Sequence, residues 1–156
     1  MKWMRVILLF VLAAPVAAQA AAKEANPKMP KAIHTDGAPV AKGPYSQGIE
    51  VQGSRMLFLS GQTGRDPKSG ELVGGDIGAQ TERVMENLKA VLLAAGLDFS
   101  NVVRCTVFLT DMAEFAKMNE VYGRYFTTNP PARTTVQISA TPTKGAKVEI
   151  DAIAVH

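Results

Sequence analysis

The stretch "NPPARTTVQISATPTKGAKVEIDAIAV", residues 129–155, decides the fold class that the sequence predicts. It contains two β-rich segments, 134–138 and 147–155, joined by a turn with proline and glycine. The second segment is apolar at every even position from 148 to 154 and again at 153 and 155. Because side chains alternate between the two faces of a sheet, this strand needs apolar cover on both faces.

Upstream of these strands, the sequence predicts two helices with another strand between them. Asp76 is a favourable N-cap and Gly96 is favourable just after a helix end, and apolar residues recur at helical spacing between them. Residues 101–110, "NVVRCTVFLT", are dense in β-branched residues and predict a strand. Asp111 is then expected to cap a second helix that extends to Phe126.

The domain is predicted to open with a β-hairpin, "GIEVQ" (48–52) and "RMLFLSG" (55–61), because Gly53 and Ser54 suit a tight two-residue turn. The resulting order, β-β-α-β-α-β-β, has one strand pair at each end, which indicates a mixed sheet. We therefore expect an α+β fold, a two-layer sandwich with both helices on one face of the sheet. The other apolar face then predicts a partner subunit.

The N-terminus has the pattern of a secretory signal peptide. Lys2 and Arg5 precede the apolar run "VILLFVLAA" (6–14), and small residues follow at 18–20. The run is much shorter than the roughly 20 residues of a membrane-spanning helix, so we expect a cleaved signal rather than an anchor. This predicts a periplasmic or secreted protein with no membrane partner after cleavage. The predicted plan is a signal peptide (1–20), a polar, flexible leader (21–38) and one folded domain (39–156).

Charge and composition exclude several kinds of function. The 156-residue chain has a formal net charge of +3, which falls to +1 without the two cations of the signal peptide. No basic stripe or aromatic platform is predicted on the strands, so nucleic acid is not an expected partner. Cys105 is the one cysteine, and His34 and His156 lie near the ends, so neither a disulfide nor a zinc site is expected.

Two polar positions stand out in the closing segments. Glu149 alternates with apolar residues, and an ionised carboxylate in an apolar layer is costly unless a cation or hydrogen-bond donors meet it. It is half of a structural ion pair, with Lys144, Lys147 or Arg133 as partner, or it lies at a strand end that reaches water, or it is a catalytic group. Arg133 follows two prolines that stiffen its backbone, so it is either a surface residue or a clamp for a carboxylate or phosphate.

Other candidates are weaker. Asn119 shares the inward, core-facing stripe of the second helix with Met112, Phe115 and Tyr122, so it is either a satisfied core amide or a ligand contact. "GPYSQG" (43–48) and "LSGQTG" (59–64) combine small residues with hydroxyl or amide groups, which lets a ligand approach the backbone. Neither matches a P-loop or a dinucleotide fingerprint.

Taken together, "APVAKGPYSQG", "LFLSGQTGRDPKSGELVGG" and "PPARTTVQISATPTKGAKVEIDAIAV" resemble the reactive intermediate deaminase family, also called RidA, YjgF-like or endoribonuclease L-PSP. The resemblance covers about residues 38–155, and "PAR" and "KVEIDAIAV" are its most specific parts. It implies a chorismate-mutase-like α+β fold and a homotrimer with active sites between subunits. It also implies hydrolysis of enamines and imines, such as 2-aminoacrylate and 2-iminopropionate, to 2-keto acids and ammonia without cofactor or metal.

The resemblance also implies roles for particular residues. Arg133 would hold the substrate carboxylate and Glu149 would position and activate the attacking water. The pocket would be lined by Tyr45, Ser60, Gly61, Asn119 and Thr135. Many relatives carry cysteine at the position of Thr135, so we expect activity with an altered substrate preference. The alternatives are a non-catalytic binding or chaperone-like trimer and, ranked last, an endoribonuclease or translation inhibitor.

Overall fold

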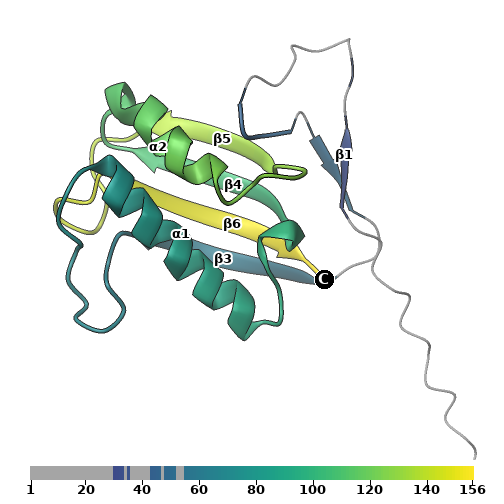
Figure 1. The fold of residues 1–156 in the computed structure, drawn as a ribbon, viewed down its shortest axis with the longest axis horizontal. Helices are drawn as coiled ribbons and strands as arrows, with labels where there is room; N and C mark the ends of the chain where they lie inside the picture. The colour runs from purple at the N-terminus through teal and green to yellow at the C-terminus, as the bar shows by residue number, and fades with distance from the viewer. Residues whose placement is uncertain (1–29, 34, 36–42, 47, 52–54) are drawn as a thin grey trace, which may run out of the picture.

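The computed structural model describes residues 30–33, 35, 43–46, 48–51 and 55–156 (Figure 1). The predicted signal peptide and most of the predicted leader lie outside these residues. The elements are β1 (Lys31–Ile33), β2 (Gly48–Glu50), β3 (Met56–Thr63), α1 (Ile77–Ala94), a 3₁₀ turn η1 (Phe99–Asn101), β4 (Val102–Leu109), a 3₁₀ turn η2 (Met112–Glu114), α2 (Phe115–Gly123), β5 (Ala132–Gln137) and β6 (Val148–Val155). Neither helix in the described part of the chain has the length and hydrophobicity that a bilayer crossing requires.

A four-stranded sheet in the order β3-β6-β4-β5 forms one layer, and α1 and α2 form the other (Figure 1). Strand β6 is antiparallel to β3 and to β4, whereas β4 and β5 are parallel. The predicted α+β class, the mixed sheet and the two helices on one face are therefore confirmed. The two strands with the most buried residues, β4 and β6, occupy the centre of the sheet.

Two predicted strand pairings are wrong. Strand β2 pairs with β1 in a separate two-stranded sheet, and β3 pairs with β6 instead. The eight residues of β3 match the length of β6, which the three residues of β2 cannot. The predicted turn at 52–54 lies outside the described residues. At the other end, β5 and β6 are separated by β4, because β6 is apolar on both faces and takes a central position while the more polar β5 takes the edge.

Strand β1 falls within the segment predicted to be a flexible leader. Its three residues, Lys31–Ile33, pair with Gly48–Glu50. A strand of three residues is too short to show alternation between apolar and polar positions, so the sequence pattern carried no signal for it.

The helix boundaries follow the predicted caps. The side chain of Asp76 accepts hydrogen bonds from the backbone N–H groups of Gly78 and Ala79. At the other end of α1, Gly96 has φ +74° and Leu97 N donates to Leu92 O, which is the Schellman arrangement. Asp111 was predicted to cap the second helix, but it caps the 3₁₀ turn η2 that precedes α2. Helix α2 itself begins at Phe115 and ends at Gly123, before the predicted end at Phe126.

The core lies between the helices and one face of the sheet. Alternation turns Cys105, Val107 and Leu109 of β4 toward the helices, where all three are buried. The opposite face of the sheet has no cover within the described residues. Phe58 and Met56 of β3 are 69% and 53% exposed there, so the face keeps large apolar side chains in contact with solvent.

Candidate active site

A cavity of about 460 Å³ beside β5 is lined by Tyr45, Met112, Phe115, Arg133 and Thr135, and we call it the arginine pocket. Strand pairing sets the direction of its β5 residues. Arg133 lies opposite Cys105 of β4, and Cys105 is buried under the helices. Residues paired across two strands point to the same face, so Arg133 and Thr135 point toward α2.

The segment that carries Tyr45 is fixed to the start of β5. Ser46 N donates to Pro131 O over 3.0 Å, and the Ser46 hydroxyl donates to Pro130 O. Ser46 also forms a parallel bridge with Ala132. Because the two prolines restrict the backbone ahead of Arg133, Tyr45 and the guanidinium are held beside each other by a stiff edge.

The Arg133 guanidinium is oriented by one amide and three aromatic rings. Its Nη1 donates to Asn119 Oδ1 over 2.7 Å. Its central carbon lies 4.7 Å from the Tyr122 ring centroid, 5.6 Å from that of Tyr45 and 5.7 Å from that of Phe115. Burial lowers the pKa of Arg133 below its ordinary value, because the charged form loses water. No carboxylate of the described residues forms an ion pair with it.

The arginine pocket offers donors for hydrogen bonds but no acid and no reactive thiol. Thr135 Oγ1 is buried and finds no hydrogen-bond partner within the described part of the chain. Behind the pocket, burial raises the pKa of Cys105 to about 12, so this thiol stays protonated at neutral pH. A guanidinium without a counter-ion next to an unpartnered hydroxyl suits an anionic, hydrogen-bonding ligand.

Glu149 lines a different cavity of about 240 Å³, which we call the glutamate pocket; its other residues are Gly61, Gln62, Thr63, Arg65, Pro142 and Thr143. The register between β3 and β6 shifts between Leu59 and Gln62, so Ser60 and Gly61 form a bulge in β3. A Cβ atom on Gly61 would collide with Glu149 Oε1 and would lie 2.9 Å from its Cδ. The missing side chain therefore lets the carboxylate lie against the backbone of β3.

Replacing Gly61 by alanine is expected to displace the Glu149 carboxylate while the fold survives, because the colliding atoms are the end of a flexible side chain. If Glu149 acts in catalysis, kcat should fall by roughly 100-fold, the cost of misplacing a catalytic group by about 1 Å. Gly74→Ala is the matched control, since a Cβ there meets nothing within 4 Å. Steady-state kinetics and thermal unfolding of both variants check this, and a Gly61→Ala enzyme with the wild-type kcat would contradict it.

Arg133 and Glu149 lie on opposite faces of the sheet. Glu149 is flanked by Val148 and Ile150, which are buried on the side of the helices, so Glu149 points to the uncovered face. Of the predicted site residues, Tyr45, Asn119, Arg133 and Thr135 meet in the arginine pocket, whereas Gly61 and Glu149 meet in the glutamate pocket, with Ser60 in the adjoining bulge. One chain alone therefore does not bring the guanidinium and the carboxylate together.

The structure also bears on the alternatives that the sequence left open. Lys147 pairs with Glu114 over 2.8 Å, and among the described residues no ion pair involves Glu149. Asn119 uses its carbonyl to orient Arg133, so it is a satisfied amide that also belongs to the site. Met112 and Phe115 were predicted only as core positions on the inward stripe. A stripe that mixes aromatic residues with an amide was the one signal that could have assigned them to a pocket.

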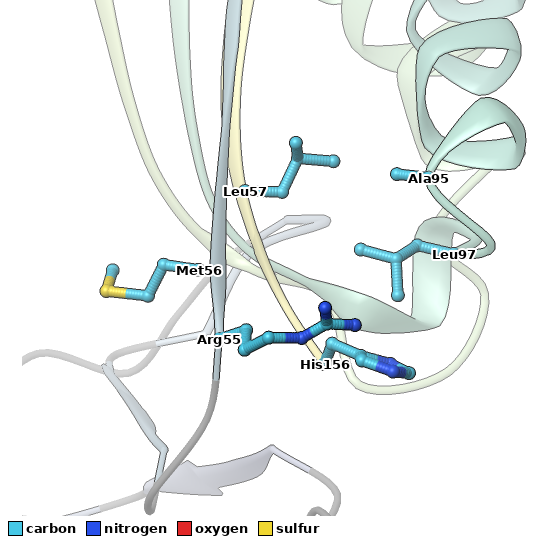
Figure 2. Close-up of a pocket in the computed structure, with 6 residues that line it drawn as sticks. All are labelled: Arg55, Met56, Leu57, Ala95, Leu97 and His156. Carbon is cyan, nitrogen blue, oxygen red and sulfur yellow. The ribbon is translucent and has the colours of Figure 1, made fainter.

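Another cavity, of about 220 Å³, lies between the end of α1 and the start of β3 and is lined by Arg55, Met56, Leu57, Ala95, Leu97 and His156 (Figure 2). Arg55 and His156 extend to the side of β3 on which Leu97 lies, whereas Met56 points the other way. The C-terminal end of a helix carries partial negative charge, which cationic side chains offset. This cavity contains no carboxylate side chain, so it lacks the acid–base pair of a hydrolytic site.

The fold and the arginine pocket define a small α+β protein with a pocket whose lining suits an anionic ligand. The chain belongs to the family described as endoribonuclease L-PSP, whose model matches residues 35–156. It is 68% identical over 125 residues to protein DfrA of Myxococcus xanthus, covering 80% of this chain and 95% of that protein. It is 48% identical over 126 residues to 2-iminobutanoate/2-iminopropanoate deaminase of Mus musculus, covering 81% and 90%.

A solved structure shares this fold. The structure of E. coli TdcF with bound serine is similar with a TM-score of 0.62 and 43% identity, covering 81% of this chain and 98% of that one.

Proposed function

We propose that this protein hydrolyses 2-imino acids and their enamine tautomers to 2-keto acids and ammonia. The observation that carries the proposal is Arg133, a half-buried guanidinium held in a cavity without a counter-ion among the described residues. Relatives at this level of identity are named 2-iminobutanoate/2-iminopropanoate deaminases, which act on small carboxylates. TdcF has been crystallised with serine, another small molecule with a carboxylate.

Arg133 binds the substrate carboxylate. The side-chain carbonyl of Asn119 accepts a hydrogen bond from Nη1 of Arg133, and the Tyr122 ring centroid lies 4.7 Å from the guanidinium carbon. The remaining N–H groups of the guanidinium therefore keep a fixed direction. A planar fork held in this way can form two parallel hydrogen bonds to a carboxylate with little further loss of freedom. Thr135 Oγ1, which is buried without a partner in the described part of the chain, is placed to donate to the same ligand.

A second copy of the chain supplies Glu149, together with Ser60 and Gly61. Within one chain Glu149 faces the uncovered side of the sheet, the same face on which Phe58 and Met56 are exposed toward the other end of β6. Association through this face buries those apolar side chains and carries the glutamate pocket of one copy to the arginine pocket of another. We therefore propose a homotrimer with active sites in the clefts between subunits, as the family resemblance implies.

Hydrolysis then needs only positioning and proton transfer. Glu149 accepts a proton from water as its oxygen attacks C2 of the protonated imine, which forms the C–O bond. The same carboxylic acid returns the proton to nitrogen. The carboxylate then takes the hydroxyl proton as the C=O bond forms and the C–N bond breaks, and it passes this proton to the departing ammonia, so that ammonium and the 2-keto acid leave. An enamine first gains a proton at C3 to become the imine. Because an imine is already reactive, fixed geometry supplies much of the rate.

The export predicted from residues 1–20 remains a prediction.

Purified protein should accelerate ammonia release from 2-iminopropanoate generated in situ. An amino-acid oxidase acting on alanine, with catalase present, supplies the imine, and a discontinuous ammonia assay gives the rate. A rate equal to that of buffer would reject the proposal. Tight binding of a 2-keto acid without turnover would instead indicate a non-catalytic binding protein.

A further inference from the structure

We infer that two amide side chains of α1, Asn87 and Gln80, are positioning residues for Glu149, although Glu149 points to the opposite face of the sheet. The inference rests on the proposed function, because it names the residues that hold the proposed general base in place. Asn87 and Gln80 are seven residues apart, about two turns of the helix, so both point the same way. They lie on the helix that packs against β3 and β6, the strands of the glutamate pocket (Figure 1).

Asn87 holds the residue that lies opposite Glu149. In the register of β3 and β6, Thr63 pairs with Glu149, and Thr63 is the last residue of β3. Asn87 Nδ2 donates to Thr63 O over 3.1 Å and to Arg65 O over 2.8 Å. One amide nitrogen, which has two N–H groups, therefore spans the point at which the chain leaves the sheet and fixes the end of β3 beside Glu149.

The end of β3 needs this support because the bulge at Ser60 and Gly61 interrupts the strand pairing just before it. The Glu149 side chain packs against that bulge, since only the missing side chain of Gly61 leaves it room. Beyond the bulge, a Cβ atom on Gly64 would lie 3.2 Å from the Cα atom and the carbonyl oxygen of Gln80, so the strand end lies directly on α1. A shift of β3 on the helix would therefore move the carboxylate.

Gln80 holds the other strand of the glutamate pocket. It is 3% exposed, its Oε1 accepts a hydrogen bond from Lys147 N over 2.8 Å, and its Nε2 donates to Gly145 O over 3.4 Å. Lys147 directly precedes β6, the strand that carries Glu149. A buried amide that is satisfied at both ends leaves the start of this strand little freedom.

The arginine pocket is held by other contacts. Asn119 of α2 orients Arg133, and the hydrogen bonds that the structure describes for Asn87 and Gln80 all go to residues outside that pocket. Loss of the Asn87 amide should therefore disturb the proton transfer at Glu149 and spare the binding of the substrate carboxylate. Such a change lowers kcat and leaves KM nearly as it was.

The first experiment measures kcat and KM for 2-iminopropanoate generated in situ. Asn87→Ala should lower kcat by about tenfold or more, since misplacing a catalytic group by about 1 Å costs about 100-fold. KM should stay within about twofold of the wild-type value. Asn87→Asp keeps the shape of the side chain but has no N–H group to donate, so it should lose as much activity.

Asn101→Ala is the matched control. Asn101 Nδ2 donates to Val155 O over 3.0 Å, and its Oδ1 accepts a hydrogen bond from Asp98 N over 3.0 Å. The control variant therefore also loses two hydrogen bonds between an asparagine side chain and the backbone, but at the end of β6 opposite to Glu149. It should keep the wild-type kcat.

The second experiment separates the positioning of Glu149 from a general loss of stability. Arg133→Ala chains supply only the glutamate pocket and Glu149→Gln chains only the arginine pocket, so a mixture of the two should be active. Asn87→Ala added to the Arg133→Ala chain should lower that activity as much as it lowers kcat. The same change added to the Glu149→Gln chain should leave the activity within about twofold, whereas a destabilised fold would lower it in both placements.

Equal losses in the two placements would overturn the inference and leave the deaminase function standing. So would a folded Asn87→Ala enzyme whose kcat stays within about threefold of wild type. If the wild type hydrolyses imines but the mixture without Asn87→Ala is inactive, the arrangement of the two pockets is wrong and the inference fails with it. If the wild type hydrolyses no imine, the proposed function and the inference both fail.

Discussion

Replacing Arg133 by alanine should lower kcat/KM for imine hydrolysis by roughly 10²- to 10³-fold, the usual loss when a partly buried charged partner of a ligand is truncated. The side chain has no counter-ion in the described residues, so its charge is available to the substrate. Its loss also leaves Asn119 Oδ1 without its donor. We expect KM to rise and kcat to fall, because the guanidinium both binds and orients.

Two further variants separate charge from geometry. Arg133→Lys keeps a cation but cannot form two parallel hydrogen bonds or lie flat on the Tyr122 ring, so it should recover only part of the lost activity. Arg124→Ala is the matched control, since Arg124 is an exposed arginine on the surface beside α2, paired with Glu120. The midpoint temperature of thermal unfolding of each variant should be close to that of the wild type. A folded Arg133→Ala enzyme that stays within threefold of wild type contradicts the assigned role.

Mixing two inactive variants should restore activity, because the two pockets lie on opposite faces of one chain. Arg133→Ala chains retain the glutamate pocket, and Glu149→Gln chains retain the arginine pocket. When subunits are exchanged at equal concentrations, a site is complete if its arginine comes from one variant and its glutamate from the other. Random assortment in a closed ring predicts about one quarter of the wild-type activity.

The control for this experiment is each variant taken alone through the same unfolding and refolding, which should yield no activity. Doubly substituted Arg133→Ala, Glu149→Gln chains mixed with wild type should lower activity instead of restoring it. Persistent inactivity of a refolded mixture of the two single variants, shown to contain mixed assemblies, would mean that both residues act from one chain. Activity of the Glu149→Gln variant taken alone would mean that Glu149 is not needed.

Helices were predictable from the sequence because their signals are local. Asp76 and Gly96 mark the ends of α1 through capping geometry that depends on a few neighbouring residues. The pairing of strands depends on contacts between distant segments instead. Gly53 and Ser54 suggested a hairpin, yet β3 pairs with β6, whose length and alternation match it better.

The candidate site shows the same division. The polar oddities on the closing strands pointed to Arg133 and Glu149, since a charge among apolar residues is visible in one sequence. That these side chains point to opposite faces follows from the register of β5, β4 and β6, which the sequence did not reveal. Met112 and Phe115 were hidden for another reason: an apolar residue on a helix stripe looks the same whether it packs on the core or lines a cavity.

The buried thiol of Cys105 has a practical consequence. It is the one cysteine in the chain, it is 1% exposed, and burial raises its pKa to about 12. A thiolate is the nucleophile that adds to a maleimide dye, so the folded protein should be nearly inert toward such dyes at neutral pH. A cysteine introduced at an exposed position such as Leu93 would then be a unique attachment point for a fluorophore, without first removing the native one.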